Sequence, residues 1–205
     1  MLKVHHARRA RSVRVLWLLE ELEVPYAIEP IEFRPEALRS AEYLQVHPLG
    51  QVPVVELVET HTRIFESGAI LQYLLEQHDR EGRLAPKPGS AQRAEFLQWF
   101  HFGEATLARY ASEVIRHQYG QPAEERVPEV VGAMRRRYRK AVELVDRVLR
   151  DRAYILGAEF SAADIMVSYG ISTTKIAAEL PAELTHVAAY LKRLMERPAY
   201  RKAWQ

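Results

Sequence analysis

The strongest constraint on the fold is a break in the sequence pattern between Arg80 and Ser90, a segment interrupted by glycines and prolines. Before it, short β-branched runs alternate with helical runs, whereas every long run after it has the apolar spacing of a helix. Glycine and proline at this density favour a linker. We therefore predict an α/β domain over residues 1–80, a linker over 81–89 and an all-helical domain over 90–205.

The α/β half predicts the element order β-α-β-α-β-β-α. Strands are expected over residues 2–6, 26–33, 54–58 and 63–65, and helices over 13–22, 35–44 and 66–75. A strand–helix–strand crossover requires parallel pairing, and two strands joined by a tight turn require antiparallel pairing. The sheet should therefore be mixed.

The second half predicts helices only. One long helix is expected over residues 91–117, with a bend near Gly103, and another over 124–150. A third begins at Ser161, and Pro181 separates it from a fourth, because proline cannot continue the helical hydrogen-bond ladder.

Composition excludes several classes of function. The chain has no cysteine, which removes disulfides, thiolate metal sites and a cysteine nucleophile. A formal net charge of +2 is too small to indicate a nucleic-acid partner. His5 and His6 lack the third ligand of a metal site. The N-terminus has no long apolar stretch, so we expect a cytoplasmic protein without a membrane span.

Pro53 stands at the start of a predicted strand, after the turn residues Leu49 and Gly50. A proline here is ordinarily a trans edge residue, since only about 5–6% of X–Pro bonds are cis. The same place carries a cis-proline in thioredoxin-like domains. A cis bond would turn the backbone of Val52 outward, where its N–H and C=O could pair with an extended peptide by strand addition.

Glu66 and Ser67 open the next predicted helix. A polar pair at a helix start is often only a cap. It can also bind an α-amino acid end group, because the helix N-terminus and the serine hydroxyl suit a carboxylate while the neighbouring carboxylate suits an ammonium.

Together these motifs resemble the glutathione transferase family. The resemblance covers essentially the whole chain, and it is carried by residues 47–54 and 65–74, with the opening residues 3–6 and 14–22. It implies a thioredoxin-like N-terminal domain, an all-α C-terminal domain and a homodimer. It also implies conjugation of glutathione, as co-substrate, to a small hydrophobic electrophile.

The resemblance also implies roles for particular residues. Val52, next to Pro53, would pair with the cysteinyl backbone of glutathione, Glu66 and Ser67 would hold its γ-glutamyl end, and Gln51 would lie near its glycyl carboxylate. Tyr110 and His117, on the first long helix, are candidates for the second-substrate pocket.

The sulfur-activating residue departs from the family pattern. Similar bacterial proteins usually carry a serine four residues before the arginine that matches Arg14, and this chain has Ala10 there. The nearest hydroxyl belongs to Ser12, which is either a catalytic donor or the N-cap of the first helix, and we favour the cap. Helix N–H groups and the arginines of the loop would then support the thiolate.

Two other functional classes remain open. Ala10 favours a glutathione-binding carrier or interaction module with little transferase activity. A glutathione-dependent reductase or peroxidase is the other alternative, although the lack of cysteine argues against a mixed disulfide with the protein.

In the helical half, Ser161 and Asp164 have the spacing of a capping box, flanked by Phe160 and Ile165 as a hydrophobic staple, and we expect Asp164 to serve folding.

Overall fold

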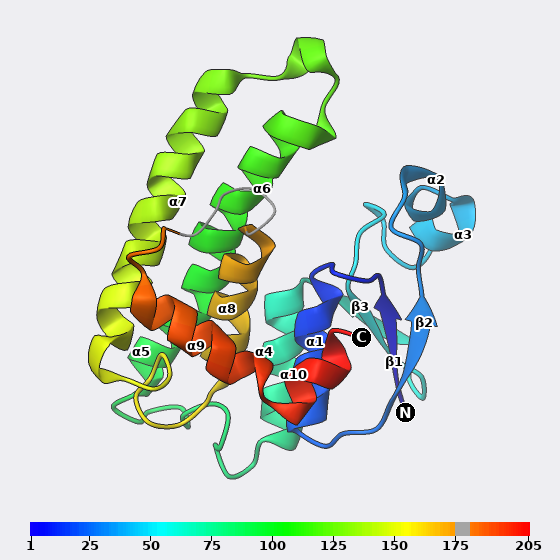
Figure 1. Ribbon diagram of the computed structural model, residues 1–205. Helices are drawn as coiled ribbons and strands as arrows, with labels where there is room; N and C mark the ends of the chain where they lie inside the picture. The colour runs from blue at the N-terminus through cyan, green and yellow to red at the C-terminus, as the bar shows by residue number, and fades with distance from the viewer. Residues whose placement is uncertain (175–180) are drawn as a thin grey trace. The chain divides into compact units, whose positions relative to one another are not determined.

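The computed structural model describes residues 1–174 and 181–205, and these residues form two compact units. Unit 1 comprises Met1–Arg83 together with Met195–Gln205, and unit 2 comprises Leu84–Leu194. The C-terminal segment, which we predicted as part of the helical domain, thus clusters with the α/β unit. Figure 1 shows the elements of both units along the chain.

Unit 1 contains a four-stranded mixed sheet, as predicted. Its strands lie in the order β2-β1-β3-β4. Strand β1 is parallel to β2 and antiparallel to β3, and β3 is antiparallel to β4. The strands are β1 (Leu2–His6), β2 (Tyr26–Pro30), β3 (Val54–Leu57) and β4 (Thr62–Phe65). The second strand ends at Pro30, three residues short of its predicted end at residue 33.

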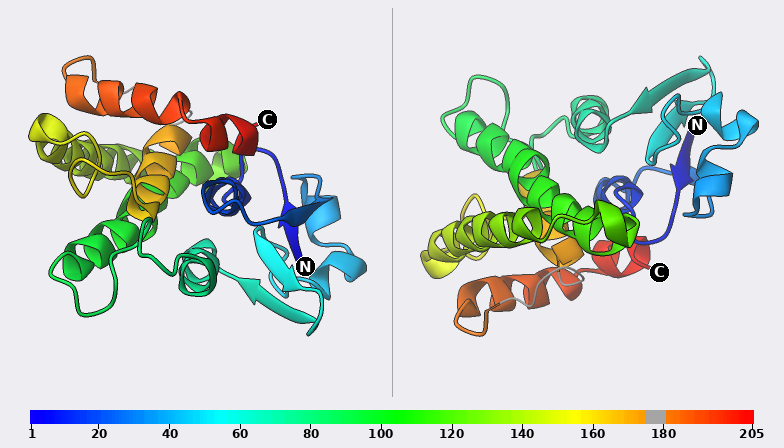
Figure 2. Two further views of the ribbon diagram at one scale, coloured as in Figure 1. Left: turned by 90° about the horizontal axis from the view of Figure 1, so that it is seen from below. Right: turned by 90° about the horizontal axis from the view of Figure 1, so that it is seen from above.

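Helices cover both faces of this sheet (Figures 1 and 2). Side chains alternate between the faces of a strand, so Val4 and His5 of β1 point in opposite directions. The ring of His5 lies 6.2 Å from that of Tyr43, on the face covered by α2 and α3. The helices are α1 (Ser12–Glu21) and α4 (Ser67–His78) on one face, and α2 (Pro35–Leu38) and α3 (Ala41–Leu44) on the other.

The sheet register defines the end of the sheet at which the predicted site lies. His5 pairs with Val54, and Val54 pairs with Phe65. Beyond this row β1 leads into the loop before α1, β3 is preceded by Gly50–Pro53, and β4 is followed by Glu66. Three chain segments that are distant in sequence therefore meet at one sheet end.

The C-terminal segment is held to α1 by buried contacts. Arg197 donates two hydrogen bonds of 2.7 Å to the two carboxylate oxygens of Glu21. The indole N–H of Trp17 donates to the same carboxylate at 3.0 Å. The short helix α10 (Pro198–Ala203) follows, and its Tyr200 packs edge-on against Trp17. These contacts explain why this segment belongs to unit 1.

Unit 2 is helical in its described part, apart from an isolated β-bridge between Tyr154 and Gly157. The predicted long first helix runs as α5 (Arg93–Phe102), a π-helical segment (Gly103–Ala108), α6 (Arg109–Ile115) and a second π-helical segment (Arg116–Gly120). The others are α7 (Pro128–Val148), α8 (Ala162–Thr174) and α9 (Thr185–Met195). Within the described ranges, no helix is long and apolar enough to cross a membrane.

Gly103 is required by close helix packing. A Cβ atom at this position would lie 2.4 Å from the carbonyl oxygen of Met166 in α8. A π-helical segment begins at this residue, near which the sequence predicted a bend. The end of the predicted third helix lies outside the described residues.

Asp164 is the centre of a buried polar cluster at the start of α8. Its carboxylate accepts hydrogen bonds from the backbone N–H of Ile155 at 2.9 Å and of Ser161 at 2.8 Å. The hydroxyls of Ser161 and Tyr190 donate to it at 3.0 and 2.9 Å. The bond to the Ser161 N–H is the reciprocal half of a capping box. The predicted side-chain bond of Asp164 to the start of α8 is therefore confirmed, and the same carboxylate also bonds two further segments of unit 2.

Candidate functional site

The loop before β3 presents an unpaired piece of backbone. The peptide bond between Val52 and Pro53 is cis, as predicted. The side chain of Val52 is buried, yet its backbone N–H and C=O form no hydrogen bond with any described residue. Most such groups in folded proteins are paired. The backbone of Val52 can therefore accept an extended peptide as an added strand.

The start of α4 combines a buried hydroxyl with an exposed carboxylate. Ser67 is the first residue of the helix and is buried, whereas Glu66 before it is exposed and has φ of +69°. That φ lies in the left-handed region, which is strained for a residue other than glycine. The strained backbone places a carboxylate beside the positive end of the α4 dipole.

Arg14 of α1 reaches across unit 1 to this serine. It is fully buried, and its Nη1 donates to the Ser67 hydroxyl oxygen at 3.0 Å. The serine hydrogen is then available for a carboxylate, and the guanidinium adds positive charge behind it. The sequence motifs assign no site role to Arg14. A charged residue inside the apolar run Val13–Leu19 is the signal that could have predicted a buried partner.

Gln51 is exposed, and the direction of its backbone carbonyl is fixed by a hydrogen bond from Tyr43. The hydroxyl of Tyr43 donates to the Gln51 carbonyl oxygen at 2.7 Å. Gly50, before it, has φ of +60°, and a Cβ there would lie 2.2 Å from the carbonyl oxygen of Leu38. Only glycine fits this approach. Nothing in the local sequence predicts the Tyr43 contact.

A small apolar cluster joins two sides of the site. Its buried members are Ala7 and Ala10 from the loop before α1, Tyr43 from α3 and Val52. Ala10 occupies the position where similar proteins carry a serine, and the cluster places it beside the residue expected to pair with a cysteinyl backbone. The structure thus brings together Ala10, Gln51, Val52, Glu66 and Ser67 at one end of the sheet of unit 1.

Comparisons with known proteins agree with this arrangement. The sequence profile of the glutathione S-transferase N-terminal domain matches residues 1–76. Glutathione S-transferase 3 of Schizosaccharomyces pombe is 27% identical over 213 residues, which span 99% of this chain and 86% of that protein. Residues 1–76 therefore belong to the glutathione S-transferase N-terminal domain family. GstB of Escherichia coli K12 is 28% identical over 190 residues, covering 92% of this chain and 90% of that one.

The fold of the chain also matches solved structures. A crystal structure of the glutathione transferase URE2P6 from Phanerochaete chrysosporium, in complex with oxidized glutathione, superposes with a TM-score of 0.87. The match covers 99% of this chain and 94% of that one at 24% sequence identity. It confirms the thioredoxin-like domain followed by a mostly helical domain.

Ser12 is neither an N-cap nor an exposed donor. Helix α1 begins at Ser12 itself, and the capping residue is Arg11, whose side chain makes no capping bond. The predicted cap is therefore wrong. The hydroxyl of Ser12 is fully buried because it closes the loop before α1, donating to the Ala7 carbonyl at 3.1 Å and accepting from the Ala7 N–H at 3.2 Å.

The same hydroxyl lies 2.8 Å from Nδ1 of His6. Burial, and then the positive charge of Arg8, lower the pKa of His6. The imidazole is therefore neutral at pH 7, and it joins the loop network as a neutral hydrogen-bonding partner. The surroundings of Ser12 are those of a residue that shapes the loop.

Tyr110 and His117 belong to unit 2. Tyr110 lies in α6 and is half-buried. His117 lies in the π-helical turn after α6, with Nε2 3.7 Å from the carboxylate of Glu113. Their assignment to a second-substrate pocket stays a prediction.

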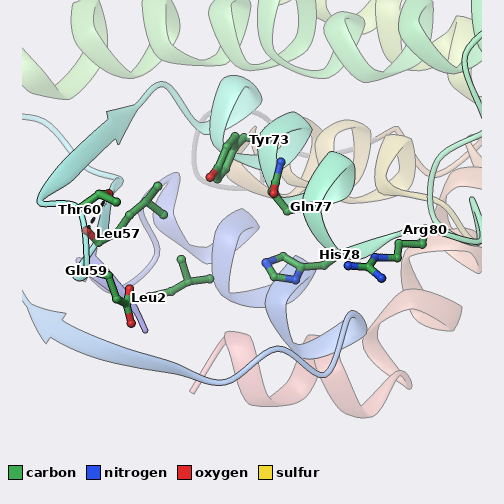
Figure 3. A pocket seen from close by; sticks show the side chains of 8 residues that line it. All are labelled: Leu2, Leu57, Glu59, Thr60, Tyr73, Gln77, His78 and Arg80. Carbon is green, nitrogen blue, oxygen red and sulfur yellow. Dashed lines mark hydrogen bonds between the residues drawn. The ribbon is translucent and has the colours of Figure 1, made fainter.

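Unit 1 also has an open hollow of about 410 Å³ beside the C-terminal half of α4 (Figure 3). It contains none of the predicted glutathione residues. Its lining residues are Leu2, Leu57, Glu59, Thr60, Tyr73, Gln77, His78 and Arg80. Among the residues that the structure describes, no group of histidine and carboxylate side chains could hold a metal ion.

Proposed function

We propose that the protein binds glutathione at this end of the sheet and transfers its thiolate to a small hydrophobic electrophile. The observation that carries the proposal is the unpaired backbone of Val52, one strand away from the Glu66–Ser67 corner. The pairing of Val54 with Phe65 places the next residues outward, Pro53 and Glu66, side by side. A γ-glutamyl peptide needs this combination of a strand-like partner and an α-amino acid clamp.

Each end of glutathione meets a group of matching chemistry in this proposal. The N–H and C=O of Val52 pair with the cysteinyl backbone. The Ser67 hydroxyl and the α4 N-terminus bind the γ-glutamyl carboxylate, with Arg14 behind Ser67. Glu66 binds the γ-glutamyl ammonium, and the exposed side chain of Gln51 lies toward the glycyl carboxylate.

The chemical step is nucleophilic attack by sulfur. The thiol releases its proton to water, the thiolate sulfur forms a bond to the electrophilic carbon, and the leaving group departs with its electron pair. Ala10 offers no hydroxyl to the sulfur, and the hydroxyl of Ser12 is used within the loop. We therefore assign thiolate stabilisation to the N-terminus of α1 and the positive charges of Arg8, Arg9 and Arg11.

Calorimetric titration with glutathione tests the binding site. Glu66→Ala and Ser67→Ala should each weaken glutathione binding by ~1–3 kcal/mol, since each removes a partner of a charged group. Glu76→Gln, on the exposed side of the same helix, is the matched control and should bind as the wild type does. Unchanged affinity in both site variants would show that the γ-glutamyl clamp lies elsewhere.

A carrier that binds glutathione without efficient transfer is the second candidate, favoured by Ala10. The two functions separate in one comparison, the glutathione affinity against the rate of conjugation to a chlorinated nitroarene. Tight binding with a rate no greater than that of free glutathione would favour the carrier. Homodimer formation, which the family implies, belongs to the same proposal and is checked by sedimentation.

A further inference from the structure

Tyr43 occupies a place that a purely structural tyrosine would not need. It is buried, and its hydroxyl donates to the carbonyl oxygen of Gln51 at 2.7 Å. Burial raises the pKa of Tyr43 to about 12, so the hydroxyl remains a donor at neutral pH. The acceptor belongs to the exposed loop of the proposed glutathione site.

The bonded carbonyl shares a peptide group with the N–H of Val52. A peptide group is planar, so fixing the direction of the Gln51 carbonyl also fixes the direction of the Val52 N–H. A hydrogen bond to the carbonyl also polarises the N–H of the same group and strengthens its donation. The hydroxyl of Tyr43 thus acts on the atom proposed to hold the cysteinyl backbone.

The ring of Tyr43 belongs to the apolar cluster of the site. It packs in the buried cluster with Ala7, Ala10 and Val52, so the loop before α1 and the loop before β3 share one apolar cluster with this ring.

Tyr43 is itself held from several directions. Its backbone N–H donates to the hydroxyl of Ser40, the cap of α3, at 3.1 Å. Arg63 of β4 donates to the carbonyl of Gln45, just after α3, at 2.7 Å. The helix that carries Tyr43 is therefore attached to the sheet, which fixes the position from which the hydroxyl donates.

We propose that Tyr43 is a positioning residue for glutathione: its hydroxyl orients the Gln51–Val52 peptide group, and its ring packs in the cluster that holds Val52 and Ala10. The assignment rests on the proposed function and names a residue that acts through the binding loop. In the proposed complex Tyr43 does not contact glutathione. Its removal affects the cysteinyl contact and leaves the γ-glutamyl clamp in place.

The test is Tyr43→Phe, which removes the hydroxyl and keeps the ring. Loss of one hydrogen bond to a binding group should raise the glutathione Kd about five-fold, and the KM for glutathione with it, while the KM for the electrophile stays unchanged. Tyr26→Phe is the matched control. The hydroxyl of Tyr26 also donates a partly buried hydrogen bond, to the Glu20 carboxylate at 2.5 Å, but this bond lies away from the site. The control should lose stability without losing affinity.

A measurement without glutathione gives an independent result. In the free protein, the amide proton resonance of Val52 should move upfield in Tyr43→Phe and stay in place in Tyr26→Phe. Wild-type binding with an unchanged Kd in Tyr43→Phe, or an unmoved Val52 resonance, overturns the positioning role. A wild-type protein that does not bind glutathione overturns the proposed function, and the positioning assignment with it.

Discussion

The two units bury polar groups in different ways. In unit 2 the carboxylate of Asp164 receives four donors from Ile155, Ser161 and Tyr190. In unit 1 the sheet end leaves the backbone of Val52 unpaired among the described residues and keeps Glu66 exposed. Both regions lie at a helix start, α8 in one and α4 in the other.

The difference separates a polar cluster that serves folding from one that can serve binding. A buried group with every partner inside the protein has nothing left to offer a ligand, and removing it leaves several donors unsatisfied. Backbone groups of an ordered loop that have no partner within the protein can form hydrogen bonds with a ligand. Arg14 and Ser67 connect the two types, because the bond between them is internal while the serine hydrogen remains available.

The largest effect that would test this difference between the two units is expected from Asp164→Ala. The change leaves the N–H groups of Ile155 and Ser161 and two hydroxyls without their acceptor, so the free energy of unfolding should fall by ~3–5 kcal/mol. Chemical denaturation measures it. Asp151→Ala, at an exposed carboxylate in the same unit, should change stability by less than ~0.5 kcal/mol.

Glutathione affinity gives the other half of the Asp164 test. Under conditions where Asp164→Ala is folded, its glutathione Kd should equal that of the wild type. A stable variant with a weakened Kd would break the comparison, because it would make the closed cluster part of binding.

A smaller effect is expected at the loop before α1, where Ser12→Ala removes the hydroxyl that closes it. The Ala7 N–H and the His6 ring each lose a partner, so we expect a loss of ~1–3 kcal/mol in unfolding free energy. Ala10→Ser adds a hydroxyl at the family's usual position and should raise the conjugation rate. The thiolate absorbance of bound glutathione against pH is the common measurement.

Ser12→Ala should leave the pKa of bound glutathione unchanged, and Ala10→Ser should lower it. A raised thiol pKa in Ser12→Ala with normal stability would instead make Ser12 a catalytic donor. This pair of variants compares a hydroxyl used internally with one that faces the ligand.

Much of the fold was predictable because it depends on patterns that are local in sequence. The glycine and proline punctuation near residue 85, the β-branched runs and the loop lengths determine the mixed sheet and the helical half. The cis bond at Pro53 and the helix start at Glu66 and Ser67 were predicted from motif spacing. The N-cap role favoured for Ser12 was wrong, because the residue type permits a hydroxyl at a helix start but does not tell which atoms that hydroxyl contacts.

Contacts between distant segments were beyond the sequence analysis. Tyr43 reads as an ordinary apolar position of a short helix, and its bond to Gln51 exists only because α3 folds beneath that loop. Likewise, nothing local places Met195–Gln205 with α1, since the Glu21–Arg197 pair joins residues at opposite ends of the chain. Such pairings depend on three-dimensional packing.

The smallest expected effect is an opposite pH response of buried groups in the two units. Burial lowers the pKa of His5, His6 and His47 in unit 1, so their contribution to stability is complete above about pH 6.5 and is lost as pH falls through the folded-state pKa. Burial raises the pKa of Asp164 in unit 2 to about 6, so its protonated form is favoured in the fold, and its contribution is lost as pH rises through 6. Lowering the pH from about 7.5 to about 5.5 should therefore destabilise unit 1, while protonation of Asp164 reduces the free-energy cost of burying its charged carboxylate in unit 2.

His5→Leu should flatten the fall in unfolding free energy over this range, and Asp164→Asn should steepen it, both measured by denaturant unfolding at the two pH values. Identical pH dependence in the wild type and both variants would show that these buried groups do not control the response, and the contrast between the units would then lie in hydrogen bonding and not in charge.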